Sequence, residues 1–322
     1  MGKNEISYII GGNTAERPFS FYGAGKLLIT GEYLVLDGAE ALAVGLSVGQ
    51  TLEVSAHGQD GVLLWSSLEN DGKCWFSAAF DSRLDIIRTS DEKTAGLLAS
   101  FLKVCLKYNP GFDFTGKNVS VRAGFDRSWG LGTSSTLMYV LGRWAGIDPF
   151  MILNEAFSGS GYDIACAGLK KRNAVVYKLE NGRPAWEETD FRPPFSDNLY
   201  FVYSGHKKNS ERAVRSYREL PRAGRMAAVE ECTRITRAML SCGTPDEFDY
   251  LVHEHENIVS GVTGMPALKD RLFPDFTGEV KSLGAWGGDF FLATGAEAPG
   301  YFRRRGYGTV LSWDSLVLDT VR

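Results

Sequence analysis

The chain has 322 residues, of which 44% are hydrophobic and 23% are charged, and its formal net charge is −4. These proportions are ordinary for a globular protein and exclude a disordered or collagen-like chain. The mildly acidic balance offers no basic surface for nucleic acid or an anionic membrane. The length predicts about two domains. Only glycine is unusual, since 37 residues exceed the usual share of about 7%; this surplus must serve particular backbone positions.

The cellular compartment can be inferred from the apolar stretches, the N-terminal segment and the cysteines. No apolar stretch reaches the length of a membrane span, and the segment Met1 to Ile6 is too polar for a signal peptide. The five cysteines are scattered and contain no Cys-x-x-Cys pair, so we expect neither a disulfide framework nor a zinc site. We therefore expect a cytoplasmic protein without nucleic-acid or membrane partners.

The first half of the chain shows two alternating apolar patterns, which predict strands at 51–56 and 119–123. A glycine turn follows the second strand. Leu137, Leu141 and Trp144 then mark one face of a helix. This helix should end before Pro149, because the residue that precedes a proline is disfavoured in helical conformation.

A double proline separates the two halves of the chain. The last element predicted before it is a strand at 174–179, and Pro193-Pro194 then interrupts regular structure, which places a domain boundary between 1–195 and 196–322. Beyond this boundary the expected elements are a strand at 199–203, helical patterns at 211–241 and 246–260, and strand-like segments near 289–294 and 309–318. Strands and helices mixed in both halves predict an α/β or α+β protein.

The first glycine-bearing segment contains Gly25-Lys26 and Gly31-Glu32. It is not a Walker A motif, because Ser20 stands where its first glycine belongs and Leu27 replaces the Ser or Thr that would bind magnesium. Lys26 therefore needs another explanation than a P-loop lysine. A surface lysine is the simplest alternative.

The second glycine-bearing segment is Gly130-Leu-Gly-Thr-Ser-Ser135, between a predicted strand and a predicted helix. The Rossmann fingerprint fails here, because Ser135 occupies the place of its third glycine. Unpaired N–H groups at a helix N-terminus form an anion site suited to phosphate. The alternative is an ordinary helix cap, since Ser and Thr are favoured there.

Two further segments carry candidate chemistry. Asp163 follows the small, flexible run Ser158 to Gly161, and is either a helix cap or a carboxylate presented to a substrate. Lys281 to Asp289 is rich in glycine and precedes an apolar strand-like run. This third glycine-bearing segment is either a plain turn or a loop packed close to a ligand.

Together, the three glycine-bearing segments resemble the motifs of the GHMP kinase superfamily, named for galactokinase, homoserine kinase, mevalonate kinase and phosphomevalonate kinase. They occur in the family's order, and Asp163 falls where mevalonate-type kinases carry their catalytic Asp. The run Gly161-Tyr-Asp-Ile-Ala165 resembles a distinct subgroup. Two departures are the missing proline before Gly130 and the intrusion of Trp286 into the third motif.

The resemblance implies an α+β fold of two domains. Residues 1–195 would form an ATP-binding domain like domain 2 of ribosomal protein S5, and residues 196–322 a ferredoxin-like domain. The implied activity is transfer of the γ-phosphoryl group of ATP to a small acceptor, with mevalonate or phosphomevalonate of isoprenoid biosynthesis as the favoured acceptors. Alternatives are a lyase like diphosphomevalonate decarboxylase, a sugar kinase, and a catalytically silent nucleotide-binding relative. A homodimer is compatible with the resemblance.

The resemblance also implies roles for individual residues. The catalytic residues would be Asp163, which accepts the acceptor's hydroxyl proton, and Lys26, which stabilises developing charge. The ATP phosphates would lie on Gly130, Leu131, Gly132, Thr133, Ser134 and Ser135. The acceptor would contact Glu32, Tyr33, Lys207, Gly287 and Gly288. Mg²⁺ would be held by Ser134 and Glu155.

The histidines of the 246–260 helix are not expected to bind a metal together. His253 and His255 are two residues apart, and residues at this spacing face different sides of a helix.

Overall fold

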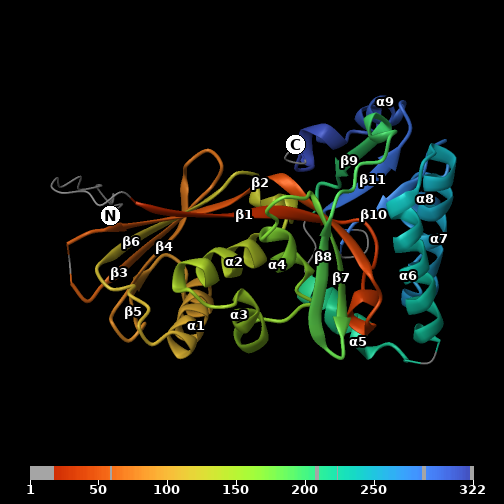
Figure 1. The fold of residues 1–322 in the computed structure, drawn as a ribbon. Coiled ribbons are helices and arrows are strands. Elements are labelled where there is room, and N and C mark those ends of the chain that lie inside the picture. Colours follow the sequence, from red (N-terminus) through yellow and green to blue (C-terminus); the bar gives the residue numbers. More distant parts are fainter. Residues whose placement is uncertain (1–17, 59, 207–209, 223, 285–287, 320–322) are drawn as a thin grey trace.

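The computed structural model describes residues 18–319 except 59, 207–209, 223 and 285–287. The chain forms a large sheet and a small sheet, each accompanied by helices (Figure 1). Among the described residues, no helix combines the length and the apolar character that a membrane crossing requires.

The large sheet contains eight strands from the first part of the chain. Its strands are β1 (Phe19–Leu28), β2 (Ala41–Ala56), β3 (Leu63–Leu68), β4 (Cys74–Phe80), β5 (Ile86–Thr89), β6 (Lys117–Ala123), β7 (Ala174–Glu180) and β8 (Arg183–Thr189). The order is β5-β4-β3-β6-β2-β7-β8, with β1 paired to β2. Only the pair β3–β6 is parallel among these described strands.

Strand β2 organises this sheet. Its residues 50–56 pair with β6 and its residues 41–44 pair with β7, while β1 runs along the opposite edge. Between these two stretches, Leu46 forms a bridge with Val317, and Leu318 N donates to Gly45 O at 2.9 Å. The pairing of β1 with β2 shifts register between Ala24 and Lys26. Such irregularities re-aim side chains near functional sites.

Four helices cover one face of the large sheet (Figure 1). They are α1 (Glu92–Tyr108), α2 (Thr133–Ala145), α3 (Pro149–Ala156) and α4 (Tyr162–Ala167). Leu98, Leu102 and Leu141 from these helices are buried against Leu52 and Val119 from the sheet. This packing places the first turns of α2 and α4 beside β1.

The small sheet is antiparallel, in the order β10-β11-β9-β12. Its strands are β9 (Leu199–Tyr203), β10 (Val280–Ser282), β11 (Phe290–Thr294) and β12 (Val310–Ser312). The accompanying helices are α5 (Ser210–Glu219), α6 (Arg225–Ser241), α7 (Pro245–Thr263), α8 (Leu268–Leu272), α9 (Ala298–Arg304) and α10 (Trp313–Leu316). Three short 3₁₀ helices are η1 (Leu34–Asp37), η2 (Arg127–Trp129) and η3 (Ser196–Asn198).

One apolar cluster joins the two sheets. Leu27 and Val44 of the large sheet share it with Phe201, Ile235 and Phe290 of the second part. In the sequence, residue 195 lies between β8, the last strand of the large sheet, and β9, the first strand of the small sheet. The two sheets nevertheless bury apolar surface against each other. This shared packing fixes β1, which carries Lys26, against the small sheet.

Most of the elements expected from periodicity are present, and two differ. The 211–241 pattern comprises α5 and α6, because Pro221 cannot donate a helical hydrogen bond and Gly224 starts α6 at a φ of 84°. The 309–318 segment is a three-residue strand followed by α10, in which Trp313 is buried.

Candidate active site

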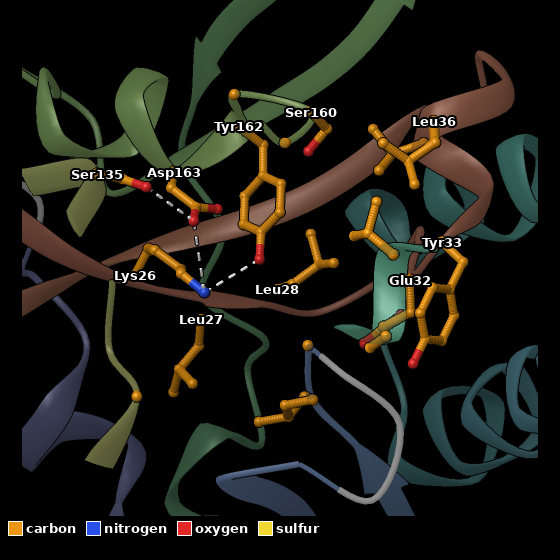
Figure 2. Close-up of a pocket in the computed structure, with 18 of the residues that line it drawn as sticks. Lys26, Leu27, Leu28, Glu32, Tyr33, Leu36, Ser135, Ser160, Tyr162 and Asp163 are labelled. Atoms are coloured by element: carbon orange, nitrogen blue, oxygen red, sulfur yellow. Dashed lines mark hydrogen bonds and ion pairs between the residues drawn. The ribbon is translucent and has the colours of Figure 1, made fainter. Parts of the chain in front are cut away.

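A pocket opens where β1, η1, α4 and α5 approach the strands of the small sheet (Figure 2). One end of this pocket is polar. Its side chains are those of Lys26, Ser135, Tyr162, Asp163 and Asp289. These residues come from four separate segments, and they include both residues predicted to be catalytic.

Lys26 is held in this pocket by its main chain and its side chain. Its backbone N–H donates to Leu131 O at 3.2 Å, which ties β1 to the glycine turn before α2. Its Nζ donates to Tyr162 Oη at 3.0 Å and lies 3.9 Å from Asp163 Oδ2 (Figure 2). The side chain is 12% exposed, so Lys26 is not the surface lysine of the alternative interpretation.

Asp163 lies in the first turn of α4 and faces the same space. Ser135 Oγ donates to Asp163 Oδ2 at 3.1 Å (Figure 2). The other carboxylate oxygen, Oδ1, is buried and has no hydrogen-bond partner among the described residues. Asp163 is therefore not a helix cap of its own helix, because Gly161 is the N-cap of α4. A buried acceptor without a partner is rare in folded proteins and indicates a functional position.

The charges of this group follow from its surroundings. Burial disfavours the charged form of Lys26, but the carboxylate of Asp163 and the Tyr162 hydroxyl raise its pKa above the ordinary value. Burial and the charge of Asp163 raise the pKa of Tyr162. At neutral pH the site therefore holds an ammonium group next to a neutral phenol.

The glycine turn before α2 has the geometry of an anion site. Gly130 and Gly132 have φ values of 67° and 96°, which side chains rarely adopt. A Cβ on Gly132 would lie 3.2 Å from Lys26 Cε, and one on Gly130 would overlap the Asp289 carboxylate. The N-cap of α2 is Gly132, and no side chain among the described residues caps this helix, so its first N–H groups are available to an anion.

The predicted phosphate-binding residues differ in their access to the pocket. Gly130 and Ser135 line it, Leu131 is fully buried, and Thr133 and Ser134 are half-buried in the first turn of α2 outside the lining. Of the predicted acceptor ligands, Lys207 and Gly287 lie outside the described residues. Gly288 is described and buried, next to Asp289.

Glu155 does not join this group, contrary to the predicted metal role. Its carboxylate accepts hydrogen bonds from Lys107 Nζ at 2.7 Å and from Tyr108 Oη. These two partners lie at the end of α1, and Glu155 does not line the pocket. The eight-residue helix α3 directs it toward α1 instead of the active site.

The other predicted acceptor ligands lie in the turn between β1 and η1. Tyr33 lines the pocket at a φ of 61° and stacks on Tyr217 with ring centroids 5.2 Å apart. Glu32 is fully buried, and its Oε1 accepts a hydrogen bond from Lys281 Nζ at 2.7 Å. Tyr33 is thus placed to contact a ligand, whereas the carboxylate of Glu32 is engaged with protein groups.

The end of the pocket next to Tyr33 is mainly apolar. The side chains that form it are those of Leu28, Val35, Leu36, Leu153, Phe157, Ala213 and Val214. They come from β1, η1, α3 and α5 and from the segment that follows α3. The pocket therefore joins a charged end to an end that suits a hydrocarbon group.

Sequence analysis missed several residues of this region. Tyr162, the partner of Lys26, is adjacent to the predicted Asp163 and belongs to the same motif, which was the available signal. Asp289 was assigned to the third motif but given no place in the site.

His255 is buried while the side chain of His253 is 53% exposed, which confirms that the two face different sides of α7.

No family model and no curated protein matches the sequence. Solved structures do match. Methanococcus jannaschii mevalonate kinase has a TM-score of 0.65 and 16% identity, over 90% of this chain and 95% of that chain. Lactococcus lactis galactokinase complexed with galactose has a TM-score of 0.67 and 12% identity, over 95% and 94%. This chain has the GHMP kinase fold.

A third match extends the comparison. Streptococcus pneumoniae phosphomevalonate kinase in complex with phosphomevalonate and AMPPNP has a TM-score of 0.65 and 14% identity, over 91% of this chain and 99% of that chain. The α+β GHMP kinase fold that the motifs implied is confirmed by these similarities, which extend over both sheets.

Proposed function

We propose that this protein is an ATP-dependent kinase that transfers the γ-phosphoryl group to a small acceptor. The observation that carries the proposal is the group formed by Lys26, Asp163 and Ser135, which lies beside the open N-terminus of α2. Phosphoryl transfer needs positioning and charge stabilisation more than covalent catalysis. An ammonium, a carboxylate and a phosphate-binding turn supply these functions together.

Each residue of the group has a distinct part in the proposed reaction. The glycine turn 130–135 and the first N–H groups of α2 bind the phosphates of ATP. Asp163 orients the acceptor hydroxyl and accepts its proton. Lys26 stabilises the charge that develops on the transferred group. Tyr162 keeps the ammonium of Lys26 in place through the 3.0 Å hydrogen bond.

The donors beside the phosphate turn fit Mg²⁺, which prefers oxygen ligands and accompanies ATP in kinases. Asp163 Oδ1 is a buried oxygen without a hydrogen-bond partner among the described residues, and hydroxyl groups stand nearby on α2. We propose Asp163 and the hydroxyls of Ser134 and Ser135 as the residues that hold the metal. When bound, Mg²⁺ would neutralise phosphate charge. Glu155 has no part in this proposal.

The apolar end of the pocket supports a branched aliphatic acceptor of the mevalonate type over a sugar. A sugar ring carries a hydroxyl on most carbons, and each buried hydroxyl needs a hydrogen-bond partner. Leu28, Leu36 and Val214 offer none, and the hydroxyl groups among the described residues of this end are those of Tyr33, Ser158 and Ser160. We therefore favour mevalonate or phosphomevalonate, and Lys207 remains a proposed ligand for the acceptor's anionic group.

The test is an ATP-consumption screen with mevalonate, phosphomevalonate and a panel of sugars and sugar phosphates. We expect consumption with a mevalonate-type acceptor and a phosphorylated product in equal amount. Release of carbon dioxide would instead identify a decarboxylase. Turnover with sugars alone would overturn the acceptor class. Binding of an ATP analogue without consumption with any acceptor would identify a catalytically silent relative.

A further inference from the structure

A cluster of four ionisable side chains is buried behind the pocket. Glu32, His255 and Lys281 are completely buried, and Glu256 is 3% exposed. Lys281 Nζ donates to Glu32 Oε1 at 2.7 Å and lies 3.6 Å from Glu256 Oε1. His255 Nε2 lies 3.3 Å from Glu32 Oε2. We call these four residues the buried charge cluster.

The buried charge cluster joins two walls of the pocket. On one side, Gly31 N donates to His255 Nε2 at 3.0 Å, directly before Glu32 and the pocket residue Tyr33. On the other side, Glu32 Oε1 accepts the hydrogen bond from Lys281 of β10, and Leu283 and Gly284, which directly follow β10, line the pocket. Glu32 therefore holds the turn before η1 and the residues after β10 at a fixed separation.

The cluster contains one clear ion pair and two neutral partners. Burial raises the pKa of Glu256 to about 8, because Lys281 only partly offsets the loss of solvent. Burial also lowers the pKa of His255 well below its ordinary value. Burial raises the pKa of Glu32 as well, and Lys281 opposes that shift; the shortest contact of opposite charges in the cluster is that between Lys281 Nζ and Glu32 Oε1, at 2.7 Å.

Burying these four ionisable groups costs desolvation free energy, so the cluster contributes little to the stability of the fold. A buried ion pair is often no more stable than apolar residues of the same volume, because both charges lose solvent. In addition, three of its buried atoms have no hydrogen-bond partner among the described residues, namely Glu32 Oε2, His255 Nδ1 and Glu256 Oε1. Such groups call for a reason beyond stability.

We infer that the Glu32–Lys281 ion pair is a positioning device that sets the spacing between the Tyr33 wall and the Gly284 wall of the pocket. The inference rests on the proposed kinase function. Glu32 is then a positioning residue that acts through the main chain, and not the acceptor ligand that the motif implied. Lys281 acts through Glu32, since its Nζ contacts Glu32 Oε1 and Ser282 O instead of the pocket.

The inference is tested with Glu32→Gln, Lys281→Met and the double variant, each compared with the wild type in steady-state kinetics with ATP and mevalonate, or the acceptor found in the screen. We expect kcat to fall at least about tenfold in each single variant while the acceptor KM stays within about threefold, because a misplacement of about 1 Å can cost a factor of 100 in rate. The double variant should be no slower than the slower single variant, because both changes remove one contact.

The matched control is Arg237→Met. Arg237 forms an ion pair with Glu40 at 2.7 Å, which also links the segment after η1 to the helices of the second part but lines no pocket wall. Its kinetics should equal those of the wild type. Unchanged kcat in Glu32→Gln would show a merely structural pair, and an acceptor KM raised tenfold with kcat retained would show a direct ligand. Either result overturns the inference.

A second readout separates this inference from the kinase proposal. Amide hydrogen exchange should accelerate in both 29–38 and 280–284 in Glu32→Gln, and in neither segment in Arg237→Met. If none of the acceptors in the screen supports ATP consumption by the wild type, the kinase proposal fails. Hydrogen exchange alone then decides the positioning role. Exchange that is unchanged in these two segments would overturn that role independently of activity.

Discussion

Asp163 gives the sharpest residue-scale prediction. Asp163→Asn keeps the shape of the side chain and the contact with Ser135 Oγ, but the amide cannot accept the acceptor's proton. We expect kcat to fall by about 10²–10⁴, while an ATP analogue in the absence of Mg²⁺ binds with a Kd within a few-fold of the wild type in calorimetry. Asp126→Asn, at the N-cap of η2, is the control. Turnover near that of the wild type in Asp163→Asn would contradict the assigned role.

Gly132 gives a second prediction at this scale. Gly132→Ala places a methyl group 3.2 Å from Lys26 Cε at a φ of 96°, so it strains the backbone and presses on the lysine. Gly182→Ala is the matched control, because Gly182 has a φ of 75° and open space around it. Both variants should lose about 1 kcal/mol of stability, but only Gly132→Ala should lose ATP-analogue affinity. Equal affinity in the two variants would contradict the phosphate-binding assignment.

At the residue scale, what sequence could predict depended on main-chain motifs. Lys26 and Asp163 were assigned because the runs Gly25-Lys26 and Gly161-Tyr-Asp163 resemble motifs of a known family. Glu155 was not predictable, because its partners Lys107 and Tyr108 lie 48 and 47 residues earlier in the chain. The environment of Glu32 was equally hidden, since Lys281 is 249 residues away in the sequence.

At the scale of elements, helix α5 is attached to the pocket by one carboxylate. Asp37 Oδ2 accepts hydrogen bonds from Tyr217 Oη at 2.6 Å and from Arg225 Nη1 at 3.0 Å. Asp37→Ala leaves the buried Arg225 without its carboxylate and should cost about 2 kcal/mol. Tyr217→Phe removes one hydrogen bond, keeps the stacking on Tyr33, and should cost about 1 kcal/mol.

Both costs are measured by denaturant unfolding. Because Ala213 and Val214 of α5 line the apolar end of the pocket, Asp37→Ala should also raise the acceptor KM more than Tyr217→Phe does. Equal effects of the two substitutions on stability and KM would show that Asp37 contributes only the tyrosine hydrogen bond.

Elements with an uninterrupted pattern were predictable, and elements with polar residues facing inward were not. The helix that begins at Thr133 shows its apolar spacing directly. In β3, by contrast, the inward position 67 carries a serine, whose hydroxyl accepts a hydrogen bond from Trp65 Nε1 at 3.0 Å. This buried pair satisfies itself locally but breaks the apolar alternation. Strand β1 was hidden in another way, because its Gly23 and Gly25 resemble a loop.

At the scale of the whole molecule, Glu256 makes stability depend on pH. Its pKa is about 8 in the folded protein against an ordinary value of 4.5. Below 4.5 both states are protonated; as the pH rises toward 8 the unfolded chain releases the proton and the folded chain keeps it. This group therefore lowers the free energy of unfolding by up to about 1.4 kcal/mol per pH unit in that window.

Glu256→Gln removes this dependence. The free energy of unfolding of Glu256→Gln minus that of the wild type should increase from pH 5 to pH 8 and become constant above pH 8, as measured by urea unfolding at each pH. A difference that does not change across this range would show that Glu256 is ionised in the folded protein. His253→Gln, at an exposed position of the same helix, is the control.

The bridge between Leu46 and Val317 has a consequence for biosynthesis. The stretch of β2 between its β7 and β6 partners is completed only by residues 317 and 318. While the chain emerges from the ribosome, β1 and β2 are therefore made long before this part of the β2 edge can be closed. Open strand edges are prone to pair with other chains, so the nascent protein should depend on chaperones until residues 317 and 318 have left the ribosome.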